Sequence, residues 1–167
     1  MNSSSTRRTF AMRFGSILSA LGIAAVGFTN SATAQSSDAG AIRKLNGEGK
    51  PGSEKDVIMP TVIHNGVIYV SGIGAHDSRD KKEWTIESHT TNVMDKLKKM
   101  VEVGGGTMDT VVQANVFLTN IEHWDGMHKV FGTYFPHGGP ARTTVAVAAL
   151  PGNSLVEINC IAVVAQK

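Results

Sequence analysis

Hydrophobic and polar residues alternate along two short segments on either side of residue 65, which predicts a β-hairpin. The segments read TVIH and VIYVSG, and the Asn65-Gly66 dipeptide between them favours a tight two-residue turn. Alternation is typical of strands because successive side chains point to opposite faces of a sheet. We therefore predict paired strands over residues 61–64 and 67–72.

An apolar spacing of three or four residues replaces the alternation in two later segments, which predicts two helices. The first begins near Ile86, where Glu87 or Ser88 is expected to cap it, and ends at a run of glycines, Gly104 to Gly106. The second spans residues 123–135. The apolar stripe of the first helix comprises Val93, Met94, Leu97, Met100 and Val101, and that of the second comprises Trp124, Met127, Val130, Phe131 and Tyr134.

Further apolar segments predict strands over residues 110–120, 142–150 and 155–165. The last two are separated by a Pro-Gly-Asn turn and are expected to pair as a second hairpin. The order of elements is then ββαβαββ. That order predicts an α+β domain in which two helices cover one face of a mixed sheet.

The last two predicted strands contain one charge of each sign, Arg142 and Glu157. A charge in an apolar strand costs free energy unless it is paired or used. Alternate residues from Val156 to Val164 are apolar or small and suit packing under the helices, which leaves Glu157 on the second face. Two explanations stay open: a buried salt bridge between Arg142 and Glu157, or a functional cleft that is partly desolvated when a homo-oligomer closes over that face.

The N-terminal residues predict export. Arg7-Arg8 precede an apolar run over residues 14–28, and Ala32-Thr33-Ala34 place small residues where a signal peptidase cleaves. A membrane anchor is disfavoured because spanning a bilayer takes roughly 20 strongly apolar residues. We predict a twin-arginine (Tat) signal peptide over 1–34 and a periplasmic mature protein with no membrane association. A flexible leader over 35–56, which a short strand could tie down, precedes a domain over 57–167.

Cleavage would change the charge balance of the chain. Of 16 Lys and Arg, loss of Arg7, Arg8 and Arg13 leaves 13 against 14 Asp and Glu, a net charge near −1 with neutral histidines. Such a surface gives no electrostatic footprint for nucleic acid. The one cysteine, Cys160, cannot form an internal disulfide, and the histidines lack metal-ligand spacing. We expect no metal and no cofactor.

The C-terminal residues carry a family resemblance. The segment PARTTVAVAALPGNSLVEINCIAVVA, the strand VIYVSG and the helix–GGG–strand block between them resemble the RidA/YjgF family of imine/enamine deaminases, over roughly residues 60–165. The most specific part is Pro140-Ala141-Arg142 followed by a strand, a Pro turn and a V-E-I strand. The resemblance implies a chorismate-mutase-like fold and a homotrimer with its sites in clefts between subunits.

The resemblance also implies an activity: hydrolysis of 2-imino or enamine acids to 2-oxo acids and ammonia. Arg142 would bind the substrate carboxylate, and Glu157 would orient the attacking water or take its proton. Gly72, in a Ser-Gly pair, together with Thr144 and His128 would complete the substrate site.

This chain departs from the family at the residues that would surround the side chain of the substrate. Thr144 stands where cysteine is common, His128 where asparagine is common, and Ile58 near the place of a tyrosine. The particular imine is therefore left open. Two other functions also stay open: a non-catalytic protein that binds a small carboxylate, and an endoribonuclease, which the near-neutral charge disfavours.

Overall fold

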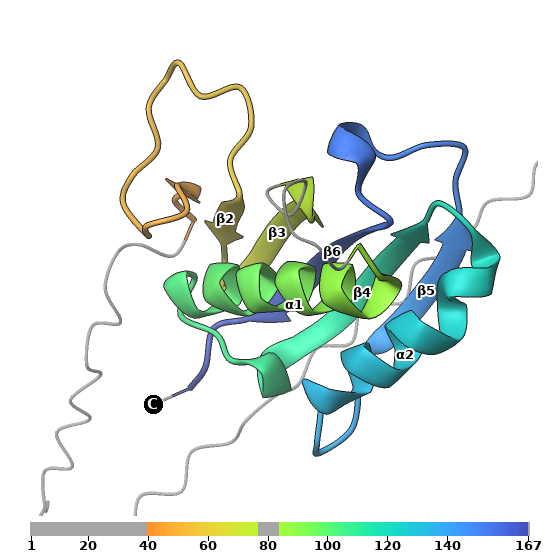
Figure 1. The fold of residues 1–167 in the computed structure, drawn as a ribbon. Helices are drawn as coiled ribbons and strands as arrows, with labels where there is room; N and C mark the ends of the chain where they lie inside the picture. Colours follow the sequence, from red (N-terminus) through yellow and green to blue (C-terminus); the bar gives the residue numbers. More distant parts are fainter. Residues whose placement is uncertain (1–39, 77–83, 167) are drawn as a thin grey trace, which may run out of the picture. The chain divides into compact units, whose positions relative to one another are not determined.

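The structure, a computed structural model, describes residues 40–76 and 84–166. They belong to one compact unit, Ser36–Lys167, and the signal peptide predicted over 1–34 lies outside them. The strands are β1 (Arg43–Leu45), β2 (Thr61–His64), β3 (Val67–Gly74), β4 (Val111–Leu118), β5 (Ala141–Ala146) and β6 (Val156–Val163). They form one mixed sheet in the order β1-β2-β3-β6-β4-β5 (Figure 1).

The first predicted hairpin is confirmed. β2 and β3 pair antiparallel, and the two turn residues have positive φ, 50° at Asn65 and 75° at Gly66. That geometry matches a turn with both central residues left-handed, which asparagine and glycine tolerate best. The short strand allowed for in the leader is also present, because β1 pairs antiparallel with β2.

Two α-helices, α1 (Ile86–Val103) and α2 (Trp124–Thr133), cover one face of the sheet, as predicted (Figure 1). The cap of α1 differs from the prediction. Thr85, not Glu87 or Ser88, is the N-cap, and Ser88 completes a capping box by bonding back to the Thr85 backbone. Short 3₁₀ segments complete the described structure: η2 (Met108–Thr110), η3 (Ile121–His123) and η4 (Pro151–Asn153).

The second predicted hairpin is wrong. β6 lies between β3 and β4 and is antiparallel to both, whereas β5 lies at the sheet edge, parallel to β4. The residues between β5 and β6 therefore reverse the chain direction and also carry it past β4, so that β6 pairs with β4 and not with β5. Neighbouring strands are only about 4.8 Å apart, so that this connection is easily long enough.

The helix-covered face of the sheet holds the core. Val156, Ile158, Cys160 and Ala162 of β6 are all buried there, as their alternation predicted. Full burial of a side chain such as Ile158 is worth about 1.5–3 kcal/mol. Burial also raises the pKa of the Cys160 thiol to about 12, which makes it an unreactive core residue.

The other face of the sheet, which we call the open face, carries apolar and polar side chains together. Its exposed apolar residues include Tyr69 (45% exposed), Val145 (42%) and Val163 (39%). At its centre the amide of Asn115 donates a hydrogen bond of 2.9 Å to Asn159.

Among the described residues, no helix combines the length and the hydropathy that crossing a membrane requires.

Candidate functional site

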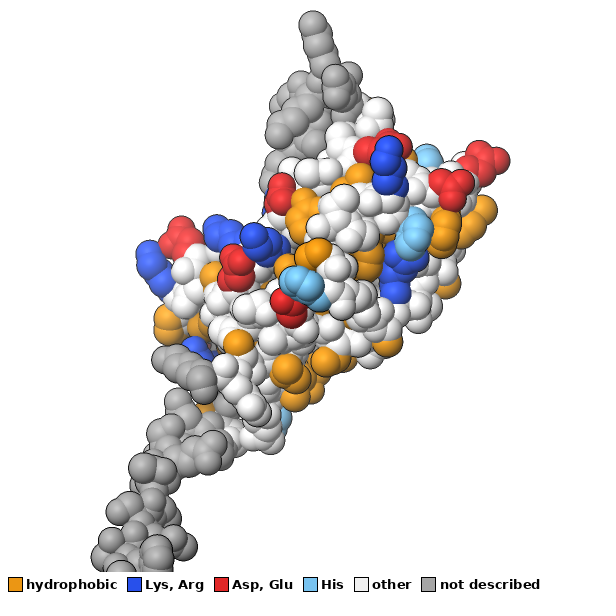
Figure 2. Space-filling model, turned by 90° about the horizontal axis from the view of Figure 1, so that it is seen from below, with side chains coloured by type: hydrophobic (Ala, Val, Ile, Leu, Met, Phe, Trp, Pro, Cys, Tyr) orange, Lys and Arg blue, Asp and Glu red, His pale blue; other side chains and the backbone are white. Residues whose placement is uncertain are grey.

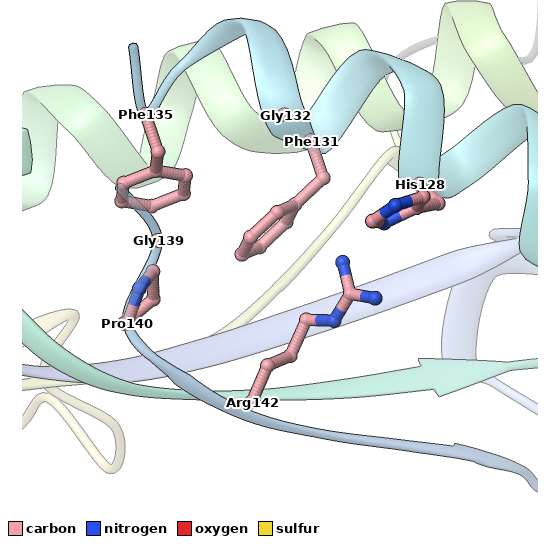
Figure 3. A pocket seen from close by; sticks show the side chains of 7 residues that line it. All are labelled: His128, Phe131, Gly132, Phe135, Gly139, Pro140 and Arg142. Carbon is pink, nitrogen blue, oxygen red and sulfur yellow. The ribbon is translucent and has the colours of Figure 1, made fainter. Parts of the chain in front are cut away.

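Arg142 lies on the helix-covered side of β5 and points toward α2 (Figure 3). Its partner on β4 is Ala114, which is buried under the helices, so that both side chains project from the same face. The guanidinium carbon lies 4.8 Å from the centroid of the Phe131 ring and 5.9 Å from that of Trp124. Both distances allow a cation–π interaction, which holds the guanidinium in place.

One side of α2 supplies the residues around Arg142. Trp124 and His128, one helical turn apart, stack with ring centroids 4.5 Å apart and an interplanar angle of 22°. Phe131, 4% exposed, follows at the next turn and contacts Phe135 with a centroid distance of 4.8 Å. Spacings of three and four residues place these rings on one face of the helix.

A cavity of about 430 Å³ opens beside the guanidinium. Its walls come from α2 and from the segment that leads into β5. The lining residues are His128, Phe131, Gly132, Phe135, Gly139, Pro140 and Arg142 (Figure 3). The volume lies within the range of small-molecule sites, about 300–1,000 Å³.

The electrostatics of this cavity favour an anion. Burial lowers the pKa of the half-buried Arg142 guanidinium, which still stays charged at neutral pH. Within residues 40–76 and 84–166, no carboxylate forms an ion pair with it. A partly desolvated cation is stabilised by a partner of opposite charge. A planar carboxylate suits a guanidinium, because it can accept two parallel hydrogen bonds from the N–H groups of the arginine.

Glu157 lies on the open face, away from this cavity. Its partners are Gly74 on β3 and Phe117 on β4. The carboxylate lies against Gly72, so close that a Cβ added to this glycine would collide with Glu157 Oε1. A β-bulge between Val70 and Ile73 contains this glycine, and bulges commonly re-aim groups at functional sites.

The predicted site residues thus form two groups within one chain. Arg142, Thr144 and His128 lie on the helix side, where the buried Thr144 Oγ1 has no hydrogen-bond partner among the described residues. Glu157 and Gly72 lie on the open face. The alternative of a salt bridge between Arg142 and Glu157 inside one chain is therefore wrong, because the sheet separates them.

The sequence pattern did not indicate that three aromatic residues contribute to this site. Trp124 and Phe131 were expected in the core stripe, yet both also contact Arg142, and Trp124 is 37% exposed. Phe135 lines the cavity and was not singled out. A sequence signal for this wall does exist: His128, Phe131 and Phe135 recur at intervals of three and four residues, which places them on one side, the side that faces β5.

No group of three or more His, Cys, Asp or Glu side chains arranged to hold a metal ion occurs in the described part of the chain. His89, the most buried histidine, is engaged elsewhere: its Nδ1 accepts a hydrogen bond of 3.0 Å from the Leu155 backbone N–H.

Comparison with known proteins gives both a family and a fold. A family model described as endoribonuclease L-PSP matches residues 58–164. A protein of unknown function of the conserved Rid protein family from Yersinia pestis is 32% identical, with a TM-score of 0.64 over 74% of this chain and 100% of that one. A proposed endoribonuclease from Thermotoga maritima is 31% identical, with a TM-score of 0.64 over 74% and 99%. The YjgF gene product of E. coli, 22% identical with a TM-score of 0.63 over 72% and 98%, shares the fold.

Proposed function

Because this chain belongs to the endoribonuclease L-PSP family, which is the RidA/YjgF family, we propose that it hydrolyses reactive 2-imino acids and their enamine tautomers to 2-oxo acids and ammonia. One observation carries the proposal. The Arg142 guanidinium is stacked on Phe131, faces a cavity and has no carboxylate partner among the described residues. A 2-imino acid supplies the carboxylate that this cation lacks.

The chemistry needs only a positioned substrate and an oriented water. Arg142 would hold the carboxylate while the water oxygen bonds to the imine carbon and the C=N electron pair moves to nitrogen. Glu157 would take the proton that the water loses and return it to the amino group. The hydroxyl oxygen of the tetrahedral intermediate then forms the C=O bond as the carbon–nitrogen bond breaks, and its proton passes to Glu157 or to solvent, which releases ammonia and leaves the 2-oxo acid. A protonated imine is already electrophilic, so that no cofactor is required.

This mechanism requires more than one copy of the chain. Arg142 and Glu157 project from opposite faces of one sheet, so that Arg142 would work with Glu157 of the partner subunit. We propose a homotrimer in which the open face of one subunit, with Glu157, packs against the β5 edge of the next, with Arg142. The exposed Tyr69, Val145 and Val163 support an interface there, since a monomer would leave these apolar side chains in water.

We place this activity in the periplasm. The support is the Arg7-Arg8 pair, the apolar run and Ala32-Thr33-Ala34, which together have the order of a Tat signal peptide. The domain contains a single cysteine and so depends on no internal disulfide, which suits a protein folded before export.

A second candidate function is carboxylate binding without turnover. The observation that favours it is the same separation of Glu157 from Arg142, because a binder needs only the arginine side of the site. Endoribonuclease activity, although part of the family's name, has less support. Acidic and basic side chains are mixed on the face shown in Figure 2, and the mature chain would carry a net charge near −1.

A competition assay tests the proposed function. An amino-acid oxidase generates imino acids, semicarbazide traps them, and the mature protein should reduce the yield of the trapped product. Arg142→Ala should abolish this effect, whereas Arg43→Ala, at an exposed position on β1, should retain it. Undiminished trapping with a folded protein that binds 2-oxobutyrate would favour the non-catalytic function instead.

A further inference from the structure

We propose that the site selects 2-imino and 2-oxo acids with large apolar side chains, above all aromatic ones. This inference rests on the proposed function, since Arg142 anchors the ligand carboxylate in both. It adds a substrate class that is set by the walls and the size of the cavity beside Arg142.

The walls are mainly apolar and aromatic. Phe131, Phe135 and Pro140 line the cavity, and among the described residues that line it Arg142 is the only Lys, Arg, Asp or Glu. Apolar walls favour a ligand in proportion to the apolar surface that it buries, and aromatic rings add stacked or edge-to-face contacts. A short substituent such as an ethyl group would leave most of these walls in contact with water.

The arrangement of the walls gives the ligand a direction. Phe131 covers one face of the guanidinium, which leaves the N–H groups at its edge for a carboxylate. Figure 3 shows Phe135 and Pro140 on one side of Phe131 and His128 on the other. The Arg142 guanidinium lies on the His128 side of Phe131, so that the side chain of a ligand anchored there would pass the Phe131 ring to reach Phe135 and Pro140.

Two glycines in the cavity wall leave additional space, because they have no side chains. Gly132 lies inside α2, where glycine is disfavoured relative to alanine, and its φ is not positive. A Cβ added at Gly132 or at Gly139 would meet no atom within 4 Å. Neither the backbone nor close packing therefore requires a glycine at position 132. Its missing side chain widens the cavity.

Titration calorimetry with two 2-oxo acids tests the inference on the full mature protein. Phenylpyruvate should bind at least about tenfold more tightly than 2-oxobutyrate, because it buries several more carbon atoms. Gly132→Ala and Gly132→Leu should lower this affinity ratio progressively as the added side chain fills the cavity. Lys129→Leu, at an exposed position of α2 outside the lining, should leave the ratio as in the wild type.

The outcomes separate this inference from the proposed function. If 2-oxobutyrate binds and phenylpyruvate binds no better, the aromatic selectivity is wrong while the carboxylate site survives. Binding of neither acid overturns both. A ratio unaffected by Gly132→Leu in a protein with a normal thermal melt also overturns the inference, and Gly132→Ala serves the same purpose should the leucine variant fail to fold.

Discussion

Arg142 and Glu157 project from opposite faces of the same sheet, and β4 lies between their strands. The two β4 residues that pair with them show the separation, because Ala114 beside Arg142 is buried under the helices whereas Phe117 beside Glu157 lies on the open face. Under the proposed function, one chain carries two half-sites: an arginine in an aromatic cavity, and a carboxylate over the Gly72 bulge.

Replacement of the arginine tests the first half-site. Arg142→Lys should weaken 2-oxobutyrate binding by about 1.5–3 kcal/mol, the range for hydrogen bonds to charged groups, because an ammonium cannot form the bidentate pair. Calorimetry measures the loss, and Arg43→Lys on β1 is the control. Equal affinity of the wild type and Arg142→Lys would remove Arg142 from the ligand site.

Replacement of the carboxylate tests the second half-site. Glu157→Gln should retain ligand binding but reduce imine hydrolysis by about 10²–10⁴-fold, since an amide keeps the shape and cannot accept the proton. Glu102→Gln, an exposed change on α1, is the matched control for the trapping assay. Destabilisation of both Arg142→Lys and Glu157→Gln with unchanged ligand affinity and turnover would mean that both charges are structural.

The sequence predicted the local parts of this fold but not its strand order. Asn65-Gly66 specifies its own turn through the two backbone conformations that it tolerates, and the helical stripes specify their buried faces. Pro151-Gly152-Asn153 looked equally like a hairpin turn. Its residues form η4 instead, and β5 pairs with β4, a partner more than 20 residues away.

The same limit applied to the site. Alternation along each strand correctly predicted that Arg142 and Thr144 share one face of the sheet, and that Glu157 and Ile158 point to opposite faces. The relation between the two strands depended on a pairing that no local signal encodes. Trp124 shows a related limit, because an aromatic residue on a helical stripe suits the core and the rim of a cavity equally well.

Buried His89 should make stability depend on pH. Burial, with a smaller effect of His123, lowers the pKa of His89 from the ordinary value of 6.5. Below pH 6.5 the unfolded chain takes up a proton that the folded chain does not, so that the free energy of unfolding falls as pH decreases toward the folded pKa. The effect is absent above that range, where both states are neutral.

Thermal melts between pH 7.5 and about 4.5 measure this dependence. His89→Gln, whose amide oxygen can still accept from the Leu155 N–H, should flatten the curve relative to the wild type. Gln113→Asn, an exposed change on β4 that removes no titratable group, is the control and should leave the wild-type slope. Parallel curves for the wild type and His89→Gln would show that acidic groups, and not His89, set the slope.

Export should depend on the paired arginines. Fractionation of cells that produce the wild type should recover a mature protein in the periplasm, and the double change Arg7→Lys/Arg8→Lys should retain the precursor in the cytoplasm. A single change at Arg13, outside the pair, is the control. Mature protein in the periplasm of the double variant would contradict the Tat route.

The most direct test of the shared site mixes two inactive variants. Arg142→Ala and Glu157→Gln each damage a different half-site, so that co-refolded mixed oligomers contain some interfaces in which an intact arginine meets an intact glutamate of the neighbouring subunit. With equal amounts and random assembly, a cyclic oligomer with such interfaces should recover about a quarter of wild-type hydrolysis. No recovery from mixed oligomers, with both variants folded, would mean that Arg142 and Glu157 do not meet between subunits and would contradict the account.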